Sequence, residues 1–167
     1  CMERGKKVQM EMGGKNPLII CSDADLDVAV SVALNGSYFS TGQRCTASSR
    51  LIVEDAIHDS FVEAMLARLS KLRVGHALDP NTEIGPVASE AQLKKDLEYI
   101  EIGKAEGADL VFGGQRLNRT TDGFFLQPAL FVSSMNSMRI NRDEIFGPIA
   151  AVLRVSDYEE AVSVAHE

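Results

Sequence analysis

The sequence predicts an α/β fold of three layers, in which a mainly parallel sheet is flanked by helices. Short apolar runs alternate along the chain with amphipathic stretches long enough for helices, and turn-forming Gly, Pro and Asp residues separate them. Helices of this length between successive strands favour parallel pairing. The 167 residues include 45% hydrophobic and 25% charged ones, which is the balance of one globular domain with its own core.

The first half of the chain alternates strand, helix and strand. The β-prone residues 17–21 predict a strand, and the side-chain oxygens of residues 22–25 can cap the helix that follows. That helix is expected over residues 26–39, because apolar residues recur there at helical spacing. The polar residues 40–46 predict a loop or a tight turn, and residues 49–53 form the next strand.

The second half begins with the most regular helical pattern. Asp55 can cap a helix whose apolar residues step by three or four positions, namely Ile57, Phe61, Met65, Leu69 and Leu72. Gly and Pro residues then predict an extended surface connection over residues 74–89. A helix over residues 90–105 follows, with Gly107 as its C-cap. The remaining expected elements are strands at 109–112, within 124–132 and at 149–155, and then a terminal helix.

Charge and composition exclude several classes of function. The chain carries 17 Lys and Arg against 24 Asp and Glu, a net charge of -7, and its basic residues form no cluster of the kind that neutralises nucleic-acid phosphates. No apolar run approaches the roughly 20 residues that span a bilayer, and no signal peptide is visible. Cys1, Cys21 and Cys45 are too few for a disulfide framework and favour a reducing compartment. We therefore expect a cytoplasmic protein that binds neither nucleic acid nor membrane.

Both ends of the sequence suggest an excerpt of a longer protein. The chain opens on Cys1, and residues 157–167 keep helical spacing without a stop signal. We therefore expect residues 1–167 to be one incomplete domain, whose site other residues could complete.

Common phosphate and metal motifs are missing from the sequence. It contains neither Gly-x-Gly-x-x-Gly nor Gly-x-x-x-x-Gly-Lys-Ser/Thr, so no dinucleotide fingerprint or P-loop is expected here. His58, His76 and His166 are too widely spaced for a local zinc motif. No metal site is expected.

Three polar segments could carry chemistry. Cys45 lies in a polar loop that can present a thiol to a substrate, and an inert packing thiol is the alternative. Glu11 lies between two methionines and before a Gly-Gly pair, which suits a general base; a solvent-facing Glu on an edge strand is the alternative. In residues 141–148, Glu144 could grip a hydroxyl-rich ligand while Phe146 packs on a ring, or the segment could be an ordinary turn with Phe146 in the core.

Three motifs follow one another along the chain: Met10-Glu-Met-Gly-Gly-Lys-Asn-Pro17, Phe39-Ser-Thr-Gly-Gln-Arg-Cys-Thr46 and Asp143-Glu-Ile-Phe-Gly-Pro148. Together they resemble the catalytic domain of NAD(P)-dependent aldehyde dehydrogenases. Glu11 precedes Cys45 by 34 residues, which matches the spacing of the general base and the nucleophile in that family. The resemblance extends over essentially the whole chain.

The resemblance implies a thiol-based oxidation of a small-molecule aldehyde with NAD or NADP. Cys45 would add to the carbonyl, a hydride would leave for the nicotinamide, and Glu11 would activate the water that hydrolyses the resulting thioester. Glu144 would accept hydrogen bonds from the nicotinamide ribose, with Phe146 close to the nicotinamide. Phe39 would line the aldehyde tunnel.

The resemblance also bears on substrate and assembly. The stretch from Gly42 to Arg50 is similar to family members that oxidise 2,5-dioxopentanoate, the semialdehyde of 2-oxoglutarate. Arg44 could pair with the carboxylate of such a substrate and favour the thiolate, or it could make a structural ion pair. The family implies a homo-oligomer and a cofactor domain that mostly precedes this segment, so the isolated segment is expected to be inactive.

Three other functions are alternatives. Aldehyde dehydrogenases that pass the acyl group to coenzyme A share the cysteine but typically lack the water-activating glutamate, so Glu11 argues for hydrolysis. A structural or oligomer-forming domain with an unreactive thiol would require Glu11, Cys45 and Glu144 to match the family by accident. A simple cysteine hydrolase is disfavoured, since no histidine lies near Cys45 in the sequence.

Overall fold

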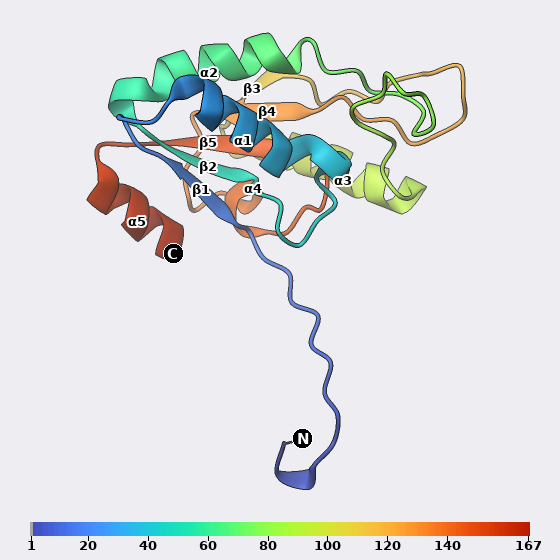
Figure 1. Cartoon of the computed structure of the whole chain (residues 1–167), viewed down its shortest axis with the longest axis horizontal. Coiled ribbons are helices and arrows are strands. Elements are labelled where there is room, and N and C mark those ends of the chain that lie inside the picture. The colour runs from blue at the N-terminus through green and yellow to red at the C-terminus, as the bar shows by residue number, and fades with distance from the viewer. Residues whose placement is uncertain (1) are drawn as a thin grey trace.

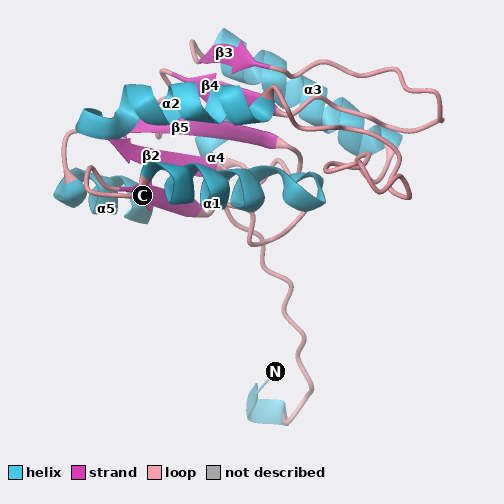
Figure 2. Ribbon diagram, turned by 45° about the horizontal axis from the view of Figure 1, so that its top comes forward, coloured by secondary structure: helices cyan, strands magenta, loops and turns pink. Residues whose placement is uncertain are grey.

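In the computed structural model, which describes residues 2–167, five strands form one sheet in the order β1-β2-β5-β4-β3. The strands are β1 Pro17–Ile20, β2 Arg50–Glu54, β3 Asp109–Phe112, β4 Ala129–Val132 and β5 Ile149–Val155. All neighbours pair in parallel except β3, which runs antiparallel to β4 at one edge (Figure 2). The predicted mainly parallel sheet is confirmed, while Cys1 lies outside the described residues.

Helices cover both faces of the sheet and make the three predicted layers (Figure 1). They are α1 Leu26–Tyr38, α2 Asp55–Leu69, α3 Glu90–Ala105, α4 Arg139–Arg142 and α5 Tyr158–His166. The helices α1 and α2 pack against one face, and α3, α4 and α5 pack against the other. Two 3-10 turns, η1 Met2–Arg4 and η2 Phe39–Gly42, complete the regular structure.

The central strand β5 shows why the layers form. Successive side chains of a strand point to opposite faces. On β5, Ala150 and Val152 join the core under α1 and α2, whereas Ala151 packs towards α3 and Leu153 towards α5. A strand that is apolar on both faces is typical of a parallel sheet covered by helices on both sides.

Two helix ends follow the expected capping chemistry. Asp25 caps α1, because its carboxylate accepts a hydrogen bond of 3.0 Å from the backbone N–H of Val28. Gly107 ends α3 with φ of +96°, and the bonds from Gly107 N–H to the Lys104 carbonyl and from Ala108 N–H to the Gly103 carbonyl complete a Schellman motif. The bounds predicted for α3, β3 and β5 are confirmed.

Several boundaries differ from the prediction. Glu54, not Asp55, is the N-cap of α2, and its side chain makes no cap bond because its carboxylate accepts from the backbone N–H of Ser22 at 2.8 Å. Asp55 is the first helical residue and pairs with Arg154 at 2.7 Å. The helix α2 ends at Leu69, so Leu72 lies beyond it. Neither the short helix α4 nor the 3-10 turn at Phe39 has a distinct pattern in the sequence.

The connection between α2 and α3 is only partly a surface segment. Val74 and Ile84 form an isolated parallel bridge, and Ile84 and Val87 are buried in the core. Between Val74 and Ile84, residues 76–81 form an exposed tip. Next to these buried residues, Gly85 and Ala88 form hydrogen bonds with residues that follow α1.

Candidate functional site

The candidate site lies at the amino ends of three neighbouring parallel strands. Residues 13–16 precede β1, residues 39–46 precede β2, and residues 143–147 precede β5. Because the amino ends of parallel strands meet at one edge of a sheet, these three segments lie side by side. We call the second the Cys45 loop and the third the Glu144 loop.

The Cys45 loop begins with an unusual backbone. Ser40, Thr41 and Gly42 have φ of 55°, 59° and 64°, all in the left-handed region, so the chain turns sharply at the end of α1. A Cβ on Gly42 would lie 2.2 Å from the carbonyl oxygen of Gly147. Only glycine therefore lets the Cys45 loop and the Glu144 loop approach each other this closely.

Hydrogen bonds hold the Cys45 loop in place from several sides. Arg44 donates from its guanidinium to the carbonyls of Asn35 and Gly36 at the end of α1. Asn16 donates from its side-chain amide to the Cys45 carbonyl at 2.6 Å. The Cys45 side chain remains exposed, and within the described residues its backbone N–H takes part in no backbone hydrogen bond.

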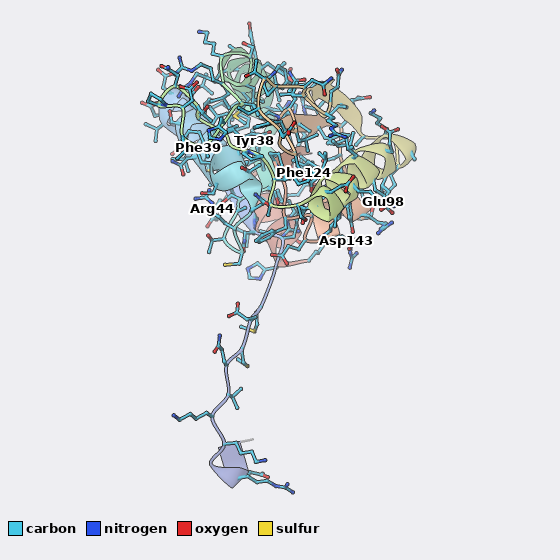
Figure 3. All side chains as sticks on the ribbon, turned by 90° about the vertical axis from the view of Figure 1, so that its right-hand side faces the viewer. Tyr38, Phe39, Arg44, Glu98, Phe124 and Asp143 are labelled. Atoms are coloured by element: carbon cyan, nitrogen blue, oxygen red, sulfur yellow. The ribbon has the colours of Figure 1, made fainter. Side chains whose placement is uncertain are left out.

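Further contacts join this loop to the connection before α3. The Thr41 hydroxyl donates to the Gly85 carbonyl at 3.3 Å, and the Gln43 side chain accepts from the backbone N–H of Ala88 at 2.9 Å. Phe39 lies half-buried at the start of the loop, next to the fully buried Tyr38 (Figure 3).

The Glu144 loop presents one acid and one aromatic ring. Glu144 is half-buried. Phe146 has φ of 64°, and the residue is 38% exposed rather than packed in the core. A bulky residue in the left-handed region is a strained arrangement that surrounding contacts must maintain.

Helix α3 supplies those contacts. Lys95 donates to the Glu144 carbonyl at 2.8 Å, and Gln92 donates to the Ile145 carbonyl at 2.9 Å. Tyr99 donates to Asp143 at 2.8 Å, and this bond lowers the pKa of the Asp143 carboxyl. The sequence reading missed these residues, although polar or charged side chains at steps of three and four on one face of α3 are a signal that could have found them.

The segment before β1 contacts the Glu144 loop directly. A Cβ on Gly13 would lie 1.9 Å from a carboxylate oxygen of Glu144, so Gly13 makes room for this acid. Lys15 is half-buried beside it. Burial, with a smaller contribution from the Arg50 charge, lowers the pKa of the Lys15 ammonium to about 7, although the charges of Asp143 and Glu144 act in the opposite direction.

The structure brings together three of the six predicted site residues, Arg44, Glu144 and Phe146. These three residues and Gly14 line one narrow cavity, and Cys45 follows Arg44 in the chain without lining the cavity itself; Phe39 does not line it either. The amino-terminal segment before β1 runs away from the body (Figure 1). Glu11 in this segment is exposed, and its side chain accepts a 3.2 Å hydrogen bond from Gln9. The structure therefore does not bring Glu11 to Cys45.

Other surface features lie away from this site. One groove, between α2 and the sheet, is lined by His58, Asp59, Val62, Glu63, Leu66, Val132, Ser133 and Arg154. Over residues 2–167, no three His, Cys, Asp or Glu side chains are grouped so that they could hold a metal ion. None of the helices in that range combines the length and the apolar character needed to cross a membrane.

A family comparison matches the chain as a whole. The sequence model described as the aldehyde dehydrogenase family covers residues 1–167. The chain belongs to the aldehyde dehydrogenase family. This confirms the resemblance drawn from the three motifs, which supply the three adjacent segments of the site.

Two curated aldehyde dehydrogenases are similar to the chain. It is 44% identical over 168 residues to alpha-ketoglutaric semialdehyde dehydrogenase of Bacillus subtilis, covering 99% of this chain and 34% of that protein. It is 43% identical over 164 residues to betaine aldehyde dehydrogenase of Mesorhizobium japonicum, covering 97% of this chain and 34% of that protein. The chain thus spans about a third of the length of these relatives.

Solved structures of similar sequence share the fold. Betaine aldehyde dehydrogenase from Staphylococcus aureus, solved in complex with NAD+, has a TM-score of 0.91 at 42% identity, covering 94% of this chain and 32% of that one. HpcC from Thermus thermophilus has a TM-score of 0.89 at 42% identity, with the same coverage. The predicted catalytic-domain architecture is therefore confirmed.

This aldehyde dehydrogenase chain also buries a carboxyl group behind its site. Asp96 is fully buried, and burial raises the pKa of its carboxyl to about 7, while the hydrogen bond from Gln92 and the charge of Lys95 act in the opposite direction. When the pKa of a carboxyl is higher in the folded state than in the unfolded state, the folded protein loses stability as pH rises from the unfolded-state pKa to the folded-state pKa. The cost is therefore absent at acid pH and complete above pH 7.

Replacement of Asp96 by asparagine should remove this pH dependence. Asp96→Asn changes the free energy of unfolding at each pH. We expect this change to be more stabilising at pH 8 than at pH 4 by about 2–4 kcal/mol. Urea unfolding of both proteins at the two pH values measures this difference. An equal effect of the substitution at both pH values would show that the carboxyl does not titrate in this range.

Proposed function

We propose that this chain is the nucleophile-bearing domain of a longer NAD(P)-dependent aldehyde dehydrogenase, which oxidises an aldehyde to a carboxylic acid. The observation that carries the proposal is the arrangement at the amino edge of the sheet. It sets an exposed thiol on a hydrogen-bonded loop, next to Arg44, which lines the same cavity as Glu144 and Phe146. Family membership and the order of the three motifs support it.

We assign the nucleophilic attack on the aldehyde carbonyl to Cys45, whose thiol is exposed. Its thiolate would bond to the carbonyl carbon and give a thiohemiacetal, and loss of a hydride would leave a thioester. The oxyanion that forms needs a hydrogen-bond donor, and the backbone N–H of Cys45 is available for this role. Asn16 holds the Cys45 carbonyl and so restrains the loop that carries this donor.

We assign the residues around the cavity to one end of a nicotinamide dinucleotide. Glu144 offers a half-buried carboxylate that can accept hydrogen bonds from ribose hydroxyls, and Phe146 exposes a ring held by its strained backbone. When bound, NAD or NADP would supply the hydride acceptor. Glu144 and Phe146 would hold and orient it beside Cys45.

Glu11 is the group that we assign to hydrolysis of the thioester. It would take a proton from the attacking water, so that the acid is released and the thiol is restored. Gly13, two residues further on, lies against the Glu144 carboxylate. Because two residues of chain span at most about 7 Å, the Cα of Glu11 lies within that distance of the Cα of Gly13. In the full-length enzyme we expect this segment to fold back towards Cys45.

We further propose an acidic semialdehyde, such as 2,5-dioxopentanoate, as the substrate class. The relative at 44% identity is named for such a substrate, and Arg44 borders the cavity. The relative at 43% is named for betaine aldehyde, which carries a positive charge, so overall identity does not separate the two classes. The family resemblance supports a homo-oligomer in the full-length protein.

Substrate preference tests both proposals. We expect the full-length enzyme to oxidise 2,5-dioxopentanoate with a higher kcat/KM than betaine aldehyde or a neutral aliphatic aldehyde. Arg44→Ala should reduce this preference about tenfold, because a charge-assisted hydrogen bond contributes about 1.5–3 kcal/mol. Steady-state rates with NAD and with NADP measure both effects.

The matched control is Arg142→Ala, which removes an exposed arginine at the end of α4, directly before the Glu144 loop, and should leave the preference unchanged. If the Arg44→Ala enzyme keeps its preference for the acidic aldehyde, Arg44 does not bind the substrate. Its role is then structural, through its hydrogen bonds to two carbonyls at the end of α1. Absence of any cofactor-dependent oxidation in the wild-type enzyme would disprove the function itself.

A further inference from the structure

The Asp96 carboxyl lies behind the candidate site rather than in it. It comes from α3 and is fully buried. One oxygen accepts a hydrogen bond of 2.7 Å from the Gln92 side chain, and no donor within the described residues reaches the other oxygen. A buried carboxyl with one unpaired oxygen destabilises the folded state, so we expect a function that explains it.

Gln92 connects Asp96 to the Glu144 loop. The same side-chain nitrogen that donates to Asp96 also donates to the Ile145 carbonyl at 2.9 Å. Asp96 therefore fixes the orientation of the amide that holds the loop. Lys95 holds the neighbouring Glu144 carbonyl from the same helix.

Gly147 connects Asp96 to the Cys45 loop. A Cβ on Gly147 would lie 2.2 Å from an oxygen of Asp96, so the carboxyl packs directly against the backbone of Gly147. On its other side, the Gly147 carbonyl packs against Gly42, where a Cβ would lie 2.2 Å from that oxygen. Asp96, Gly147 and Gly42 thus form a contiguous stack from α3 to the loop that carries Cys45.

We propose that Asp96 is a positioning residue that sets the separation of the Cys45 loop and the Glu144 loop, acting through Gln92 and Gly147. It touches neither substrate nor cofactor in this scheme. The effect on cofactor binding rests on the proposed function, because Asp96 would position Glu144 and Phe146, to which that function assigns the cofactor.

The stack explains how a buried carboxyl serves this purpose. Removal of the Asp96 side chain leaves a space against Gly147 and takes from Gln92 the acceptor that orients its amide. The strained backbone of Phe146 then loses part of the support that maintains it. Asparagine preserves the shape and still offers an oxygen to Gln92, so it should restore the arrangement.

The experiment compares Asp96→Ala, Asp96→Asn and Gln92→Met in the full-length enzyme. Glu98→Ala is the matched control, since Glu98 is an exposed acid on the same helix (Figure 3). Hydrogen exchange of the backbone amides of residues 143–149, read by mass spectrometry, reports on the loop without any need for activity. Calorimetric titration with NAD and with NADP reports the dissociation constant.

We expect Asp96→Ala and Gln92→Met to speed exchange of the loop amides about tenfold and to weaken dinucleotide binding about tenfold, as loss of one or two hydrogen bonds predicts. Asp96→Asn should stay within about threefold of wild type, and Glu98→Ala should equal wild type. The KM for the aldehyde should change less than the dissociation constant of the dinucleotide.

Unchanged exchange in both Asp96→Ala and Gln92→Met would overturn the proposal, as would faster exchange with unchanged dinucleotide binding. A loss in Asp96→Asn as large as that in Asp96→Ala would also overturn it. If Asp96→Ala does not fold, the pair of Gln92→Met and Asp96→Asn decides. A wild-type enzyme that binds neither NAD nor NADP would refute the proposed function, while the exchange data would still decide whether Asp96 positions the loop.

Discussion

Substitution of Cys45 by alanine is expected to abolish aldehyde oxidation by the full-length enzyme, with a fall in kcat of at least about 10⁴-fold. No other thiol among the described residues lies at the candidate site, so no neighbouring group can take over the attack on the carbonyl. Cofactor reduction followed by absorbance measures the rate. Binding of the dinucleotide should persist, because Glu144 and Phe146 are unchanged.

Cys21 provides the control for this prediction. It lies half-buried at the end of β1, and burial together with the charge of Glu54 raises the pKa of its thiol, which disfavours the reactive thiolate. Cys21→Ala should therefore keep nearly full activity, and iodoacetamide should modify Cys45 well before Cys21. Activity that survives in Cys45→Ala would contradict the thiol mechanism.

Glu11 should affect a later step than Cys45. In Glu11→Gln the first turnover should proceed and release one equivalent of reduced cofactor per site, after which hydrolysis of the thioester becomes slow. Loss of a general base typically costs about 10²–10⁴-fold in rate. A rapid-mixing burst followed by slow turnover would support this role, whereas unimpaired turnover would exclude it.

Gly42→Ala is expected to cost about 2–4 kcal/mol of stability and to displace the Cys45 loop. The added Cβ meets the Gly147 carbonyl oxygen at 2.2 Å and the Ser37 carbonyl oxygen at 2.9 Å, and both are backbone atoms that cannot rotate away. The left-handed φ of 64° adds about 1 kcal/mol, and the steric overlap adds about 1–3 kcal/mol. Urea unfolding and the alkylation rate of Cys45 measure the two effects.

Gly107 separates the two causes. Its φ of +96° is also in the region that favours glycine, but a Cβ there would meet no atom within 4 Å. Gly107→Ala should therefore cost only about 1 kcal/mol and leave the reactivity of Cys45 intact. Equal losses of stability in Gly42→Ala and Gly107→Ala would show that the close contact of the Cys45 loop with the Glu144 loop does not contribute to stability.

The regular elements were predictable because their signals are local. The period of residues 90–105 and the glycine after them define α3, and the β-prone residues 149–155 define β5. Asp55 was assigned wrongly as a cap because the strand before it continues to Glu54, whose carboxylate is used by the β1 to α1 turn. That contact joins residues 32 positions apart, and no local pattern reports it.

The candidate site was predictable only in part, for the same reason. Cys45, Glu144 and Phe146 stand in motifs that a reader can recognise along the chain. Asp96 acts on residues about 50 positions away, through a contact that depends on the absence of a side chain at Gly147. The distance of Glu11 from Cys45 likewise depends on the path of the chain before β1, which the sequence pattern leaves undefined.

The connection between α2 and α3 has a consequence for how this protein can vary. Its buried end supports the Cys45 loop through the Gly85 carbonyl and the Ala88 N–H, whereas residues 76–81 face solvent. Insertions and deletions are tolerated best where the backbone is exposed and carries no such contacts. We therefore expect length differences among natural homologues, and successful insertion of an epitope tag, to fall at Leu78–Pro80, while a single-residue deletion at Gly85–Ala88 would move the nucleophile.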